Sequence, residues 1–75
     1  MVRPTAVTNR IRVLRTEAGL TQAQLAEQLG VTRQTVIAVE QGRYSPSLEL
    51  AFQIAAVLGR PIDQVFTYEP NGGAS

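Results

Sequence analysis

The chain of 75 residues contains neither cysteine nor histidine. Without cysteine, no disulfide can hold the fold together. The six acidic residues are scattered along the chain, and there is no glycine-rich phosphate loop. The sequence therefore offers no cluster of metal ligands or catalytic groups. We expect a protein that holds neither a metal nor a cofactor and that is not an enzyme.

Long hydrophobic runs are also lacking. The longest nearly apolar stretch, residues 50–58, is too short to span a bilayer. The first ten residues lack the apolar centre of a secretory signal. A chain of this length has room for one small core, so a deep substrate cavity would remove much of what stabilises it. We expect a cytoplasmic, single-domain binding module without a membrane segment.

Positive charge is present, but it is concentrated in one half of the chain. All seven basic residues are arginine, and the formal net charge is only +1. Residues 1–43 hold six of these arginines against three glutamates, a balance of +3, whereas residues 44–75 have a balance of −2. This asymmetry indicates a surface that faces a polyanion.

The hydrophobic pattern divides the chain into three parts. Residues 1–7 contain a proline and show no helical period, which predicts a flexible arm. Residues 8–68 carry the apolar spacing of one all-α domain with five helices. Residues 69–75 are mostly small or polar, which predicts a disordered tail.

The first two helices have clear start and stop signals. The first is expected to begin with Thr8 as its N-cap and to end at Gly19, which suits a left-handed residue. Thr21 and Gln24 have the spacing of a capping box, so the second helix is expected to begin there and to end at Gly30.

A very short connection joins the second helix to the third. Only Val31 separates Gly30 from Thr32, the next N-cap candidate. Two helices joined this closely must cross steeply, which is the geometry of a helix-turn-helix. The third helix is expected to turn two valines toward the core and a mostly polar side toward solvent. The residues expected to face the core are Val36 and Val39, and those expected to face solvent are Arg33, Gln34, Ala38 and Gln41.

The C-terminal part carries more apolar surface than one small core can cover. A fourth helix begins at Ser47 and is apolar around most of its circumference, and Pro61 suits the first position of a short fifth helix. Residues 65–68 then have the composition of a strand. We predict a homodimer interface here, either by helix packing or by pairing of this short dimerisation strand between subunits. Its residues are Ile62, Val65, Phe66 and Tyr68.

The complete pattern resembles the Xre/Cro-type helix-turn-helix regulators, the group that contains the lambda and 434 phage repressors. The resemblance covers about residues 8–68, although Val13 stands where the family more usually has a charged residue. It implies a lambda-repressor-like DNA-binding domain of the short, single-domain form. The matching motifs are Asn9-Arg10-Ile11-x-x-Leu14-Arg15, Gly19-Leu20-Thr21-Gln22-x-x-Leu25-Ala26, Gly30-Val31-Thr32-Arg33-Gln34-Thr35-Val36, Glu40-x-Gly42-x-Tyr44-x-Pro46-Ser47-Leu48 and Leu50-Ala51-x-x-Ile54-Ala55.

The resemblance also implies which side chains read bases of double-stranded DNA. Arg33 and Gln34 occupy base-reading positions, where Arg can bind guanine and Gln can bind adenine, although Arg33 could instead touch only phosphate. Thr35 could reach a base or a phosphate, or it could only add its hydroxyl to the helix start. Ile37 and Ala38 could pack on thymine methyl groups.

Phosphate contacts are implied at the start of the second helix and around the third. Gln22 stands where the family binds a phosphate beside free helix N–H groups, although a merely solvated residue would look the same. Tyr44 could equally be a packing residue. The implied phosphate contacts are Gln22, Thr32, Gln41, Arg43, Tyr44 and Arg10.

In this family the positions of Arg15 and Glu40 form a partly buried ion pair that joins the first helix to the end of the third. The resemblance implies a sequence-specific transcriptional regulator, expected to be a repressor, that binds a pseudo-palindromic operator through the major groove as a homodimer. The alternative is an antitoxin or another protein-interaction module of the same fold.

Overall fold

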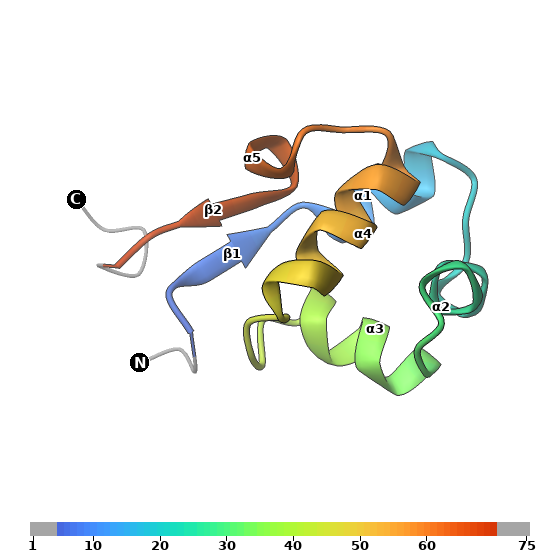
Figure 1. Cartoon of the computed structure of the whole chain (residues 1–75), viewed down its shortest axis with the longest axis horizontal. Helices are drawn as coiled ribbons and strands as arrows, with labels where there is room; N and C mark the ends of the chain where they lie inside the picture. Colours follow the sequence, from blue (N-terminus) through green and yellow to red (C-terminus); the bar gives the residue numbers. More distant parts are fainter. Residues whose placement is uncertain (1–4, 71–75) are drawn as a thin grey trace.

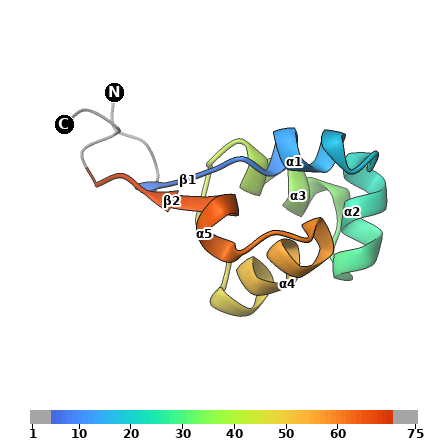
Figure 2. The ribbon, with the colours of Figure 1, turned by 90° about the horizontal axis from the view of Figure 1, so that it is seen from above.

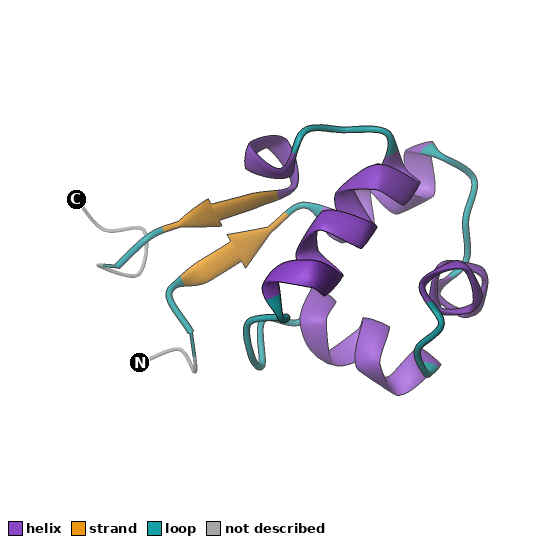
Figure 3. Cartoon of the chain, viewed as in Figure 1, coloured by secondary structure: helices purple, strands orange, loops and turns teal. Residues whose placement is uncertain are grey.

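The computed structural model of the chain describes residues 5–70. It confirms the five expected helices and adds a two-stranded sheet (Figure 1, Figure 3). The helices form one body, and the sheet projects from one end of it (Figure 2). In chain order the elements are β1 (Val7–Asn9), α1 (Ile11–Glu17), α2 (Gln22–Leu29), α3 (Arg33–Glu40), α4 (Leu48–Leu58), α5 (Ile62–Val65) and β2 (Phe66–Tyr68).

All five helices contribute to one hydrophobic core. Each helix contributes one side chain with a relative exposure of 2% or less: Ile11, Leu25, Val39, Ile54 and Val65. Val36 and Val39 both face this core, as the spacing in α3 predicts. The inward residues of α2 are also those expected from the sequence, Leu25, Ala26 and Leu29. The core therefore fixes which side of α3 remains outside.

Local hydrogen bonds define the helix ends around the turn. Thr21 and Gln24 form the expected capping box, in which each side chain accepts a bond from the other residue's backbone N–H. Gly30 ends α2 in a left-handed conformation with φ +73°. The Thr32 hydroxyl then accepts a bond from the backbone N–H of Thr35 and begins α3.

The N-terminal boundary differs from the prediction. Thr8 does not cap the first helix, because residues 7–9 form β1, which pairs antiparallel with β2. Asn9 supplies the side chain at this helix start, since its Oδ1 accepts a bond from the Ile11 N–H. The arm predicted for residues 1–7 therefore extends too far, because Val7 belongs to β1. Its first four residues lie outside the described part of the chain.

The C-terminal boundary also shifts slightly. Helix α5 begins at Ile62, with Pro61 as the N-cap residue before it. Glu69, assigned to the predicted tail, continues the strand pairing by donating its backbone N–H to the Ala6 carbonyl. Residues 71–75 of that tail lie outside the described residues. Within residues 5–70, no helix combines the length and apolar character needed to cross a membrane.

Candidate nucleic-acid interface

The turn between α2 and α3 places the start of α3 on the surface. The turn consists of Gly30 and Val31, and Val31 is half-buried against the core. In Figure 1, α3 lies along the lower edge of the molecule, while α5 lies near the upper edge. One long side of α3 is therefore available to a large partner.

The two residues expected to read bases are exposed. Arg33 and Gln34 form the first turn of α3, and both are exposed to solvent. Their side chains carry the planar donor and acceptor groups that match base edges in the major groove. Both residues therefore face solvent at the N-terminal end of α3.

The other three residues predicted to contact bases are only half-exposed. The Thr35 hydroxyl lies 3.0 Å from the Thr32 hydroxyl at the start of α3, and a hydroxyl can bond more than one partner. Ile37 and Ala38 lie between the exposed and buried sides of α3. They offer small apolar surfaces next to the polar first turn.

The residues predicted to contact phosphate lie at several places on the surface. Gln41, Arg43 and Tyr44 follow the C-terminal end of α3, and all three are exposed; Tyr44 has a relative exposure of 42%. Arg10 is exposed at the junction of β1 and α1. The hydroxyl oxygen of Thr32 accepts the N-cap hydrogen bond of α3, and its O–H group can still donate a hydrogen bond.

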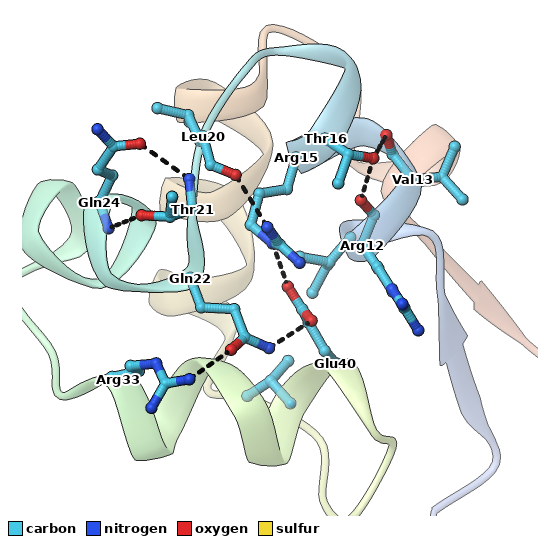
Figure 4. Close-up of polar contacts among 12 residues, drawn as sticks. Arg12, Val13, Arg15, Thr16, Leu20, Thr21, Gln22, Gln24, Arg33 and Glu40 are labelled. Atoms are coloured by element: carbon cyan, nitrogen blue, oxygen red, sulfur yellow. Dashed lines mark hydrogen bonds and ion pairs between the residues drawn. The ribbon is translucent and has the colours of Figure 1, made fainter.

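The predicted ion pair of Arg15 and Glu40 is present. Arg15 Nε lies 2.6 Å from Glu40 Oε2, and the two side chains have relative exposures of only 10% and 6%. Arg15 Nη1 also donates to the Leu20 carbonyl at 2.8 Å. The pair therefore connects α1, the loop before α2 and the end of α3 (Figure 4).

Gln22 lies at the N-terminal end of α2 and reaches both ends of α3. Its Nε2 donates to Glu40 Oε1 at 3.2 Å, and its Oε1 accepts from Arg33 Nη2 at 3.3 Å. Figure 4 shows this side chain above α3, between Arg33 and Glu40. Gln22 is thus neither isolated nor merely solvated.

Most of the described arginines are not paired with a carboxylate. Within residues 5–70, the arginines paired with carboxylates are Arg15 and Arg60, and the Arg60–Glu17 pair is long and exposed. The four other described arginines have no carboxylate partner in that range, and they are Arg10, Arg12, Arg33 and Arg43. This uncompensated charge favours an anionic partner.

A family model described as helix-turn-helix, HTH_3, matches residues 11–65. A transcriptional regulator of HTH type from Methanothermobacter thermautotrophicus, described as uncharacterized, is 59% identical over 63 residues, which cover 83% of this chain and 91% of that protein. The chain belongs to the family of helix-turn-helix transcriptional regulators.

Two further comparisons place this helix-turn-helix regulator among known proteins. It is similar to the immunity repressor protein of Bacillus phage phi105, at 37% identity over 59 residues that cover 79% of this chain and 41% of the repressor. Its fold is similar to the crystal structure of a putative DNA-binding protein from Bacteroides fragilis, with a TM-score of 0.74 and 30% identity. That match covers 81% of this chain and 98% of the other.

Two features of this helix-turn-helix regulator could not be assigned to particular contacts or residues from the sequence. Asn9 Nδ2 donates to the Val39 carbonyl at 2.8 Å, which ties the end of β1 to α3. The outer side of α4 also carries an exposed apolar stripe, formed by Leu48, Phe52 and Ala56. Its four-residue spacing is visible in the sequence, but the sequence does not show which side of so apolar a helix is covered.

Proposed function

We propose that this regulator is a repressor that binds a pseudo-palindromic operator as a homodimer and inserts α3 into the major groove. The observation that carries the proposal is the exposed first turn of α3, which consists of Arg33 and Gln34 and in which Arg33 contacts Gln22 at the N-terminal end of α2. Side chains of these types form bidentate contacts with guanine and adenine. The similarity to a phage immunity repressor supports repression.

The roles divide between reading and positioning. Arg33 and Gln34 read bases, while Ile37 and Ala38 pack on thymine methyl groups at the edge of the same surface. Arg43, Gln41 and Tyr44 bind the phosphate backbone after α3, as does Arg10 at the start of α1. The backbone N–H groups at the start of α2 add a favourable dipole toward phosphate.

A homodimer is proposed because one copy of α3 reads only a few base pairs. Two copies related by a twofold axis would place their recognition helices about 34 Å apart, on one face of the duplex. Exposed apolar side chains away from α3 support such an association, since Tyr68 has a relative exposure of 71% and Phe52 one of 54%. Half-buried Ile62 and Phe66 complete the proposed interface.

The proposal predicts sequence preference and a strong salt dependence. In-vitro selection on random duplexes should enrich a two-part, inverted-repeat sequence. If each subunit neutralises about three phosphates, a dimer neutralises about six. The slope of the logarithm of the association constant against the logarithm of the salt concentration should then be about −5. A flat salt response without any enriched sequence would refute DNA regulation as the function.

Two alanine variants should separate reading from phosphate binding. Gln34→Ala should cost roughly 1–3 kcal/mol of binding free energy at one base position in each half-site. Arg43→Ala should weaken binding to all duplexes similarly and make the salt slope shallower by about one for each subunit. Titration of the two variants against the selected site and against single-base variants of it measures both effects. If Gln34→Ala instead lost the same affinity for every duplex, Gln34 would not be a base-reading residue.

A further inference from the structure

The chain segment that leads into α1 contacts the end of α3 and the loop that follows it at two points. Asn9 Nδ2 donates to the Val39 carbonyl, in the last turn of α3, at 2.8 Å. Thr5 Oγ1 lies 2.5 Å from the hydroxyl oxygen of Ser45, at the far end of the loop. In Figure 1 this loop, coloured yellow-green, lies between α3 and the residues that lead into β1. The two hydrogen bonds therefore hold the loop near both of its ends.

The loop carries three of the residues proposed to contact phosphate, and these are Gln41, Arg43 and Tyr44. All three are exposed, and none of their side chains makes a hydrogen bond within residues 5–70. Where these side chains lie thus depends on the backbone path of the loop. That path starts at the Val39 carbonyl, which accepts the Gly42 N–H at 3.0 Å as well as the Asn9 amide.

The segment that makes the two contacts is itself fixed by the C-terminal strand. β1 pairs with β2, and Glu69 extends the pairing by donating its N–H to the Ala6 carbonyl at 2.7 Å. The Thr8 hydroxyl donates to Glu69 Oε2, also at 2.7 Å. At the other end of β1, the Arg10 N–H donates to the Val65 carbonyl at 2.9 Å. β1 therefore has a defined position before any DNA is bound.

A loop that is already ordered in the free protein binds more tightly than one that becomes ordered on its ligand. Ordering a flexible backbone costs conformational entropy, and this cost is subtracted from the binding free energy. The two hydrogen bonds restrict the loop in advance and so reduce that cost. Because phosphate contacts carry no sequence information, the gain in affinity should be the same for every duplex.

We propose that Asn9 and Thr5 are positioning residues that hold the loop after α3 in the conformation that binds the DNA backbone. This inference rests on the proposed function of DNA binding and deepens it. It assigns the β1–β2 sheet a part in affinity, although the sheet lies outside the helix-turn-helix itself. Sequence choice stays with the first turn of α3.

The test uses two variants that each remove one contact and leave the sequence of the loop unchanged. Asn9→Ser loses the amide donor to Val39, while a serine oxygen can still accept the Ile11 N–H. Thr5→Val keeps the shape of the side chain but removes the hydroxyl that meets the loop. Thr16→Val is the control, because the exposed Thr16 hydroxyl donates to carbonyls of its own helix.

Binding is measured by titration of labelled duplexes at several salt concentrations, well below the thermal midpoint of each variant. We expect Asn9→Ser and Thr5→Val each to lower the association constant about three- to tenfold, the worth of one hydrogen bond. The loss should be the same for the selected site and for unrelated duplexes. The salt slope should become shallower, by up to about one for each subunit, because a displaced loop neutralises fewer phosphates. Thr16→Val should match wild type in both measurements.

A comparison in an Arg43→Ala background makes the test specific to the loop. There, Thr5→Val should lower the association constant by a smaller factor than in wild type, because part of the contact that it positions is gone. Unchanged affinity in both variants, or a loss of affinity with the wild-type salt slope, would overturn the inference and leave the proposed function in place. DNA binding by the wild-type protein without any salt dependence would refute the proposed function itself.

Discussion

At the scale of single residues, a buried charge pair connects the elements that carry the site. Arg15 has a relative exposure of 8%, and its guanidinium is satisfied by Glu40 and by the Leu20 carbonyl. Such a pair adds little net stability compared with apolar residues, but each charge depends strongly on its partner. Its value here is orientation, because it holds α1 against the end of α3.

Glu40→Ala should therefore lower the free energy of unfolding by about 3–5 kcal/mol, since it leaves Arg15 buried without a partner. Urea unfolding followed by circular dichroism measures this change. Glu27→Ala is the matched control, because Glu27 is exposed on α2, and its effect should stay within about 0.5 kcal/mol. Equal stability of the two variants would show that the Arg15–Glu40 pair is dispensable.

At the scale of elements, the α2–α3 turn depends on one backbone conformation. Gly30 has a φ of +73°, and a Cβ atom built on it would meet nothing within 4 Å. The requirement for glycine is thus conformational rather than steric, since a side chain would have room. The turn fixes the angle at which α3 is presented.

Gly30→Ala should cost about 1–2 kcal/mol of stability, because an alanine disfavours the left-handed conformation. Gly30→Asn should cost less, since asparagine tolerates that conformation better. Thermal unfolding of the two variants beside wild type tests the order. A variant with alanine as stable as wild type would show that the turn relaxes to another conformation.

At the scale of the whole molecule, an exposed apolar surface remains after the core is filled. Val65 was predicted for the dimer interface, but it has a relative exposure of 1% and packs in the monomer core. One edge of β2 is likewise occupied by β1 of the same chain, so pairing between subunits could use only its other edge. The remaining candidates for the interface are Ile62, Phe66, Tyr68, Leu48 and Phe52.

Light scattering after size exclusion should give the mass of a dimer for the wild-type protein at micromolar concentration. Tyr68→Asp should shift the mass toward the monomer, because it places a charge on the proposed apolar interface. Val13→Asp is the control, since Val13 is also exposed, at 46%, but lies on α1. A monomeric wild type would count against the homodimer.

Prediction from sequence succeeded where the signals were local and failed where they were not. The apolar spacing of α2 and α3 and the caps at Thr21 and Thr32 involve residues a few positions apart, so their outcome was visible in the sequence. By contrast, Val7 was read as the end of an arm, because its strand partner Tyr68 lies at the other end of the chain. A three-residue strand has no periodicity of its own to reveal such a partner.

The sequence by itself determined the helices, the glycine turn between α2 and α3, and the family, because these depend on short-range hydrogen bonds and on residue spacing. Only the tertiary structure shows which apolar residues are buried in the core and that β1 pairs with β2 of the same chain. It also decided that Gln22 bridges Arg33 and Glu40, since their contact requires α2 and α3 to have already packed against each other.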